Sequence, residues 1–143
     1  MLAIENKTIV RRFFTEVLTR GNLALIDEEF GPNYVYHDPA KVGLPPGREG
    51  IKQFVTMFRT AFPDLRFQIE DEIVEGDKVV TRWTAYGTHH GKLLGALPTN
   101  KPVTIVGTYI CRFEKGKIAE TWATWDTLGV LQVVGVLPQL EYA

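Results

Sequence analysis

The segment VTIVGTYICRFEKGKIAETWATWD (residues 103–126) decides the fold class, because polar and apolar residues alternate along it on both sides of a turn. A period of two is typical of half-buried β-strands. The segment therefore predicts two strands, residues 103–113 and 117–125, paired as an antiparallel hairpin. The residues between them, Glu114-Lys115-Gly116, fit a three-residue loop in which a type I turn is followed by a left-handed glycine.

This register places seven side chains on one face of the hairpin. They are Thr108, Ile110, Arg112, Glu120, Trp122, Thr124 and Asp126. A face turned to a solid core rarely carries three charges, and a face turned to water rarely carries a tryptophan. We therefore expect this face to line a pocket with apolar walls and a few polar groups. The alternative is an exposed sheet face on which Arg112 and Glu120 form a diagonal pair.

The residues before the hairpin predict helices first and strands afterwards. Apolar residues recur at helical spacing in residues 4–19, 23–30 and 51–62. Strand patterns occupy residues 33–38, 65–70 and 79–89. This order indicates one α+β domain over residues 1–143 with an antiparallel sheet.

Composition and charge narrow the classes of partner. The net charge is −1 and the pI is about 6.3, so there is no strong positive field for a nucleic acid or an anionic membrane. The chain shows no secretion signal and no apolar run near the ~18 residues of a membrane span. Its single cysteine, Cys111, fits a reducing compartment. We expect a cytoplasmic protein that binds neither nucleic acid nor membrane.

The residues present also exclude several kinds of catalysis. The chain contains no serine, which removes serine-triad chemistry. Its three histidines lack the spacing of a zinc site, and neither a phosphate-binding loop nor a dinucleotide-binding glycine pattern occurs. The sequence therefore predicts no zinc site and no nucleotide-binding motif.

Motifs along nearly the whole chain resemble those of the SnoaL-like polyketide cyclases. They are Arg11-Arg12-Phe13-Phe14, Gly21-Asn22, Asp27, Tyr34-Val35, His37, Pro46-Gly47-Arg48-Glu49-Gly50, Ala61-Phe62-Pro63-Asp64-Leu65, Gly87-Thr88-His89, Gly91, Gly95, Arg112, Gly116-Lys117-Ile118, Glu120, Trp122 and Asp126. This family belongs to the superfamily of nuclear transport factor 2, ketosteroid isomerase and limonene-epoxide hydrolase. The order and spacing of the motifs carry the resemblance, and they do not specify a substrate.

The resemblance implies a cone-shaped, curved antiparallel β-sheet with N-terminal helices that enclose one pocket, also described as a cystatin-like roll. It implies a homodimer or homotetramer that works without a metal and without an organic cofactor. Characterised cyclases of the family close a ring of an aromatic polyketide ester by intramolecular aldol condensation, with an aspartate near the end of the last strand as acid and base. Asp126 matches that position. Arg112 stands where those cyclases have a histidine, which is a departure from the family pattern.

Three residues are candidates for catalysis. Asp126 could remove a proton next to a carbonyl and return it to the new alkoxide, or it could cap the helix that follows it. His89, at a strand end beside a glycine-rich loop, could polarise a carbonyl or bond to the backbone at the rim. Arg112 could orient a carboxylate or ester, or form a structural ion pair with Glu120.

A second group of residues is expected to bind the substrate. It comprises Tyr34, His37, Phe58, Phe62, Ile110, Glu120, Trp122 and Thr124. The aromatic members have an alternative place in the ordinary core. The opposite hairpin face is expected to point outward or between sheets and to form the homodimer contact, together with the strand over residues 65–70. The residues concerned are Leu65, Phe67, Ile69, Cys111 and Phe113.

These observations support three functional hypotheses. The first is a cofactor-independent enzyme on a small apolar or aromatic carbonyl compound, acting by aldol cyclisation or isomerisation. The second is epoxide hydrolysis by a carboxylate–arginine cluster of Arg112, Glu120 and Asp126. The third is a non-catalytic small-molecule-binding module of the same fold.

Overall fold

The computed structural model describes residues 2–40 and 43–140. In chain order its elements are α1 (Leu2–Arg12), the π-helical segment η1 (Phe13–Thr19), α2 (Ala24–Glu29), β1 (Phe30–His37), α3 (Gly47–Ala61), β2 (Arg66–Glu75), β3 (Lys78–Thr88), β4 (Pro102–Glu114), β5 (Lys117–Trp125) and α4 (Thr127–Val133). None of the described helices is long and apolar enough to cross a membrane. The predicted α+β class is confirmed.

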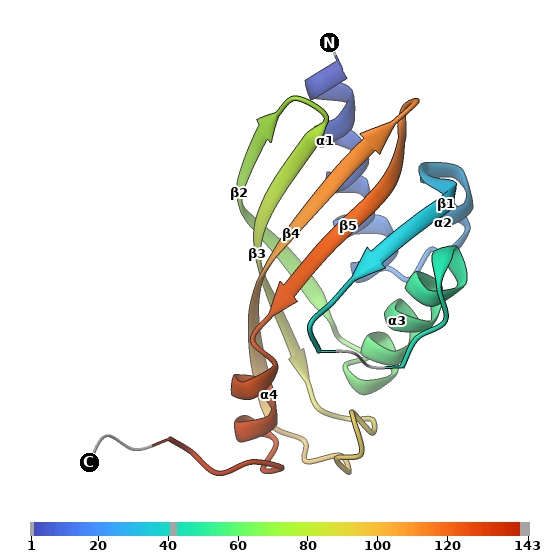
Figure 1. Cartoon of the computed structure of the whole chain (residues 1–143). Helices are drawn as coiled ribbons and strands as arrows, with labels where there is room; N and C mark the ends of the chain where they lie inside the picture. The colour runs from blue at the N-terminus through green and yellow to red at the C-terminus, as the bar shows by residue number, and fades with distance from the viewer. Residues whose placement is uncertain (1, 41–42, 141–143) are drawn as a thin grey trace.

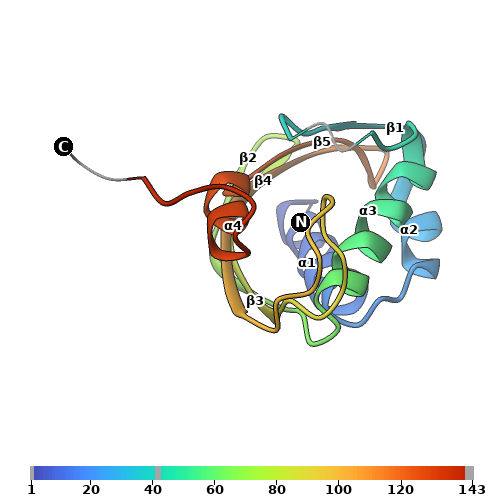
Figure 2. The ribbon, with the colours of Figure 1, turned by 90° about the horizontal axis from the view of Figure 1, so that it is seen from below.

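The five strands form one strongly curved sheet in the order β1-β5-β4-β3-β2. Strands β2 to β5 pair antiparallel, whereas β1 joins the edge parallel to β5. Helices α1 and α3 lie on the concave side of the sheet and close it, as Figure 1 and Figure 2 show. The sheet and these helices therefore enclose the interior from opposite sides, as the predicted cone-shaped fold requires.

The turn of the β4–β5 hairpin is shorter than predicted. Glu114 pairs directly with Lys117. The loop therefore holds only Lys115 and Gly116, whose φ values are 52° and 77°. Two successive left-handed residues are typical of a type I′ turn, so the predicted three-residue loop is wrong. The extra residue is instead Ala119, which a β-bulge in β5 leaves unpaired.

This bulge keeps the predicted residues on one face, because it shifts the register by one residue and so restores the alternation. The pairs themselves differ from those of a three-residue loop, which would place Arg112 opposite Ile118. Ile110 lies opposite Trp122, and Arg112 lies opposite Glu120. That face nevertheless points away from the helices, and Thr124 on it is exposed. The prediction that this face lines the pocket is wrong, because the helices cover the other side of the sheet.

The inner face of the hairpin carries the buried side chains. They are Val103, Ile105, Tyr109, Cys111, Phe113, Ile118, Thr121, Ala123 and Trp125. The five residues expected to point outward belong to the core or pack against it, which corrects that expectation as well. They are Leu65, Phe67, Ile69, Cys111 and Phe113. The core therefore sits between this face and the helices η1 and α3.

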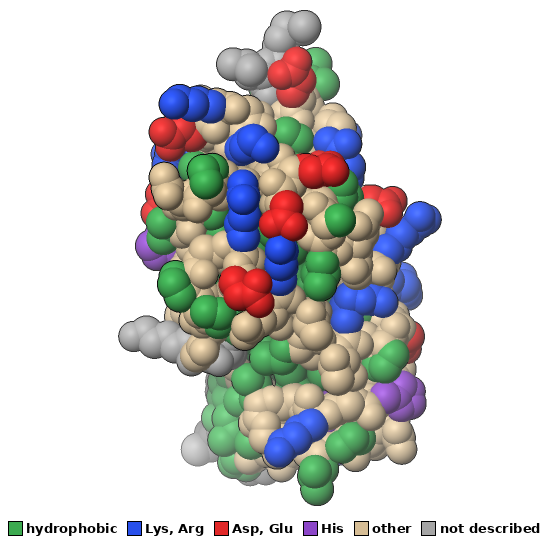
Figure 3. All heavy atoms as spheres, turned by 90° about the vertical axis from the view of Figure 1, so that its right-hand side faces the viewer, with side chains coloured by type: hydrophobic (Ala, Val, Ile, Leu, Met, Phe, Trp, Pro, Cys, Tyr) green, Lys and Arg blue, Asp and Glu red, His purple; other side chains and the backbone are tan. Residues whose placement is uncertain are grey.

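The outer side formed by β1, α2 and α3 carries charges of both signs in close alternation (Figure 3). One example is the ion pair between Lys52 Nζ and Asp27 Oδ1, at 2.9 Å. Such mixing produces no extended field of one sign, in keeping with the net charge of −1. This side therefore has no extended patch of one charge to attract a strongly charged partner.

Candidate functional site

A narrow cavity lies between the sheet and the helices η1 and α3. Its walls are formed by Phe13, Phe14, Leu18, Tyr36, Ile51, Phe54, Phe58, Phe67, Trp83, Tyr109, Ala123 and Trp125. The cavity volume is only about 30 Å³, which accommodates one or two water molecules. Because Tyr36, Phe54 and Phe67 are only partly buried, they form the outer part of the wall. A ring-sized ligand therefore needs these aromatic walls to move apart.

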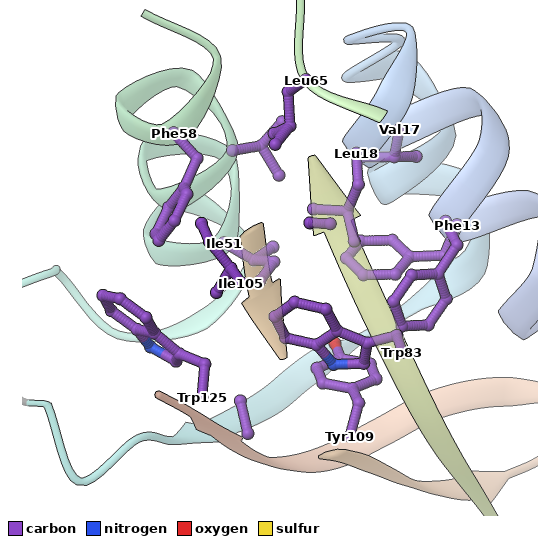
Figure 4. Packing of buried hydrophobic residues seen from close by; sticks show 14 of the residues in the cluster. Phe13, Val17, Leu18, Ile51, Phe58, Leu65, Trp83, Ile105, Tyr109 and Trp125 are labelled. Atoms are coloured by element: carbon purple, nitrogen blue, oxygen red, sulfur yellow. The ribbon is translucent and has the colours of Figure 1, made fainter. Parts of the chain in front are cut away.

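Aromatic rings from helix and sheet face each other across this cavity. Tyr109 stacks on Phe13 with ring centroids 5.6 Å apart, and Phe58 meets Trp125 edge to face at 5.1 Å. Figure 4 shows these side chains converging with Trp83 from β3. Gly107 of β4 makes room for the indole, since a Cβ there would lie 2.3 Å from Trp83 Cζ2. The arrangement suits a flat, apolar ligand.

Asp38, directly after β1, is the carboxylate connected to this cavity. Its Oδ2 accepts hydrogen bonds from the Tyr36 hydroxyl at 2.8 Å and from Trp125 Nε1 at 3.1 Å. Its Oδ1 accepts a bond from the backbone N–H of Ala40 at 2.8 Å. Burial, together with the neighbouring Asp38 charge, raises the pKa of the Tyr36 phenol, which therefore remains a neutral donor. Two cavity-wall side chains thus hold one half-buried carboxylate in a fixed orientation.

The predicted site residues of the outer face form a separate polar cluster. Arg112 Nε donates to Glu120 Oε1 at 3.1 Å, and His37 Nε2 lies 2.6 Å from Glu120 Oε2. The His37 ring stacks on Trp122 at 5.4 Å. The hydrogen bonds from His37 and Arg112 lower the pKa of the Glu120 carboxyl, and the bond to Glu120 raises the pKa of Arg112. Arg112 and Glu120 therefore form the structural ion pair that was predicted from the sequence as the alternative to substrate binding.

Asp126 also lies outside the cavity. Its side chain is exposed and accepts a hydrogen bond from the backbone N–H of Gly129 at 2.9 Å, as the N-cap of α4. Asp126 therefore caps α4, which is one of the two roles that the sequence predicted for it. The expectation that its carboxylate faces an apolar pocket is wrong, because strand β5 ends before the chain turns outward into the helix.

Comparison with known proteins defines the family. The family model for SnoaL-like polyketide cyclases matches residues 8–133. The chain belongs to the SnoaL-like polyketide cyclase family. Nogalonic acid methyl ester cyclase from Streptomyces nogalater is similar, with 27% identity over 112 residues that cover 77% of this chain and 83% of that protein.

Solved structures agree with this family assignment. The structure of a candidate polyketide cyclase from Acidithiobacillus ferrooxidans superposes with a TM-score of 0.82 and 30% identity, covering 92% of this chain and 95% of that chain. AclR from Streptomyces galilaeus superposes with a TM-score of 0.84 at 24% identity, covering 99% of this chain and 87% of that one, and supports the fold alone.

Among the other predicted residues of this SnoaL-like chain, only Phe58 lines the cavity. Tyr34 is buried and its hydroxyl bonds to Thr121 deeper in the cone. Phe62 is completely buried but packs on His89 rather than on the cavity. In the described part of the chain, no three His, Cys, Asp or Glu side chains come together as metal ligands. Sequence reasoning did not select Asp38 as a site residue. The Asp38-Pro39 step, which ends the strand, was the local pattern that could have indicated it.

His89 is completely buried at the start of the loop that follows β3. Its Nδ1 lies 3.0 Å from the Thr99 hydroxyl, and its Nε2 has no hydrogen-bond partner among residues 2–40 and 43–140. Backbone bonds from His89 N–H to the Lys101 carbonyl and from Asn100 N–H to the His89 carbonyl close the base of this loop. His89 therefore holds the loop in place and does not reach the cavity.

Acidification is expected to destabilise the fold through His89. Burial lowers the pKa of the His89 imidazole in the folded protein. At pH values between the folded and the unfolded pKa, the unfolded chain therefore binds more protons than the folded chain. The stability that neutral His89 contributes to the fold is complete above the unfolded pKa of about 6.5, and it is lost as the pH falls through the folded pKa. Urea unfolding from about pH 7.5 to pH 5 should show falling midpoints for the wild type and a shallower slope for His89→Asn. His90→Asn, which changes an exposed histidine, should alter the slope less than His89→Asn, because the His90 charge is only a minor cause of the lowered His89 pKa; equal slopes in all three proteins would contradict the assignment.

Proposed function

We propose that this chain catalyses cofactor-independent proton transfer next to a carbonyl group in a small apolar or aromatic compound. The reaction type is intramolecular aldol cyclisation or a related isomerisation, and the acid/base group is Asp38. The observation that carries the proposal is the Asp38 carboxylate, bound by Tyr36 and Trp125 from the aromatic cavity wall. The family assignment supports a cyclase or isomerase type of activity.

The chemistry needs one carboxylate that first takes and then returns a proton. Asp38 would accept the proton from the carbon next to the carbonyl as that C–H bond breaks, leaving an enolate. In a cyclisation, the enolate carbon would form a C–C bond to a second carbonyl of the same molecule, and the resulting alkoxide would take the proton back from Asp38. In an isomerisation, the proton would return to another carbon. Atoms and charge balance in both cases without a cofactor.

The surroundings of Asp38 support this role. The three donors that bind the carboxylate fix its position, which would hold it in one place relative to a ligand in the cavity. The aromatic walls would hold a flat ligand by stacking and would exclude water from the enolate. The similarity to a protein named for the cyclisation of nogalonic acid methyl ester makes aromatic polyketide esters the first substrates to test.

A second candidate function is a binding module without catalysis. One observation favours it: apart from tyrosines, the residues that line the cavity in the described part of the chain cannot ionise. The epoxide hydrolase hypothesis has less support, because Arg112 pairs with Glu120 on the outer face and Asp126 caps a helix. The predicted homodimer or homotetramer and the cytoplasmic location remain predictions.

Deuterium exchange tests whether the chain moves protons at all. β-Tetralone carries acidic protons next to its carbonyl, and its exchange in heavy water can be followed by proton NMR. The purified protein should accelerate exchange over buffer and over heat-denatured protein, with saturation at high ketone concentration. No acceleration, combined with saturable quenching of tryptophan fluorescence by β-acetonaphthone, would overturn the enzymatic proposal in favour of a binding module.

A further inference from the structure

We propose that the aromatic cavity and the groove between α1 and β2 together bind one elongated ligand, which carries a carbonyl on its ring system at one end and a neutral aliphatic chain at the other. The carbonyl end lies beside Asp38, and the aliphatic chain lies in the groove. The inference rests on the proposed function, because the position of Asp38 decides which end of the ligand carries the carbonyl. It concerns the shape of the ligand, so affinities test it separately from catalysis.

A groove of about 530 Å³ lies between the helices α1 and η1 on one side and the strand β2 on the other. Its apolar side chains are Phe14, Phe67 and Ile69. Because Phe14 and Phe67 also line the aromatic cavity, the two hollows meet at these two rings. The cavity alone has a volume of only about 30 Å³, whereas the groove is large enough for an aliphatic chain.

The groove and Asp38 adjoin the cavity from opposite edges of the sheet. Strand β1, which ends directly before Asp38, and strand β2, which carries Phe67, are the two edge strands (Figure 1). Tyr36 on β1 and Trp125 on the adjacent β5 bind Asp38 and line the cavity there. A ligand that reaches from Asp38 to the groove therefore has its carbonyl and its aliphatic chain at opposite ends.

Phe67 is the side chain whose movement would connect the cavity with the groove. It is only partly buried, whereas Phe14 is almost completely buried. The Phe67 ring meets Phe14 edge to face at 5.6 Å and lies 5.0 Å from the Trp83 ring. Its backbone is held in place, because its N–H donates to Thr19 Oγ1 at 3.2 Å and the residue pairs with Ala85 of β3. Rotation of the Phe67 ring alone would therefore join the two hollows.

The groove favours a neutral chain over a charged group. The charged residues that line it carry both signs, and they are Lys7, Arg11, Glu70, Asp71 and Glu72. Glu72 is paired with Arg11, and Asp71 is paired with Arg82. A charged ligand group would meet both signs at close range, whereas an aliphatic chain gains free energy by covering Phe67 and Ile69.

Two isomeric ketones test this ligand shape. The distal isomer is β-tetralone with a hexyl group on the aromatic ring, on the side farthest from the carbonyl; the proximal isomer carries the hexyl group on the carbon between the aromatic ring and the carbonyl. The two isomers have the same composition, so a difference in affinity reports where the hexyl group lies. Both can be titrated by quenching of tryptophan fluorescence, since Trp83 and Trp125 line the cavity. The wild type is expected to bind the distal isomer about tenfold more tightly than the proximal isomer.

Paired variants test where the hexyl group binds. Phe67→Ala removes the ring between the cavity and the groove, and it should raise the preference for the distal isomer about fivefold because no ring has to rotate. Phe54→Ala, at the cavity wall on α3, should change both affinities alike and leave the preference unchanged. Ile69→Thr should lower the preference about threefold, because it makes the groove less apolar. Ile73→Thr, on the same strand but exposed and outside the groove, should leave the preference unchanged.

Several outcomes would overturn the inference. They are equal affinities for the two isomers, no binding of either isomer, a preference that responds to Phe54→Ala but not to Phe67→Ala, and equal effects of the two threonine variants. Proton exchange separates this inference from the proposed function. If the protein accelerates no exchange but prefers the distal isomer, the proposed catalysis fails and the binding of an elongated ligand stands. If it accelerates the exchange of β-tetralone but binds both isomers equally, the reverse holds.

Discussion

Replacing Asp38 with asparagine should lower the rate of β-tetralone exchange by about two to four orders of magnitude, the usual contribution of a positioned general base. Asparagine has the size of aspartate, and its carbonyl oxygen can still accept from Tyr36 and Trp125. Its amide group cannot take a proton at neutral pH. The measurement is the saturated exchange rate by NMR, with binding of β-acetonaphthone followed in parallel to show that the cavity persists.

Asp126→Asn is the matched control. Asparagine caps helices about as well as aspartate, so α4 should remain stable, and the side chain lies away from the cavity. We expect its exchange rate to stay within about twofold of the wild type. The opposite pattern, with activity lost in Asp126→Asn and kept in Asp38→Asn, would move the acid/base group to the end of β5.

Replacing Phe13 with alanine should lower the free energy of unfolding by about 3–5 kcal/mol, as for other large aromatic truncations in a core. Phe13 is almost completely buried. It stacks on Tyr109 and meets Phe30 at 5.4 Å, so its loss leaves a hole between η1 and the sheet that neither neighbour can fill without moving. Urea unfolding monitored by circular dichroism measures the change.

Phe54→Ala provides the comparison for this prediction. Phe54 also lines the cavity, but it is only partly buried on α3, so its truncation removes less buried area. A loss of about 1–2 kcal/mol is expected. If the two variants were equally destabilised, the cavity floor at Phe13 would be no better packed than its outer wall, contrary to the structure.

The sequence predicted which residues of the hairpin share a face but not which face is covered. Alternation is a local property, and it placed Ile110 and Trp122 on the same face correctly, although the predicted pairing was shifted by two residues. The choice of side depends on where the helices pack, which is set by contacts distant in sequence. Trp122 suggested the wrong side because its indole is partly covered by stacking on His37, outside the core. Both faces of this hairpin carry tryptophan, so composition alone could not distinguish them.

Asp38 was not identified for a related reason. Its partner Trp125 is 87 residues away in the chain, and the two meet only because β1 joins the sheet parallel to β5. Sequence reasoning placed Asp38 at the end of a short strand but chose the neighbouring His37 as the binding residue. Because side chains alternate along a strand, His37 points to the outer face. Apart from the Asp38-Pro39 step that ends the strand, the local sequence gives no signal that could have corrected the choice.

The small free volume between the aromatic walls has a kinetic consequence. If the closed arrangement must open before a ligand can enter, the association rate at high ligand concentration levels off at the opening rate of the protein. The dissociation constant then combines the contacts made in the open form with the fraction of molecules that are open. Truncating an outer wall residue such as Phe54 would accordingly raise both the association rate and the dissociation rate of a ligand. The selectivity among ligands would then depend on the completely buried residues of the cavity wall.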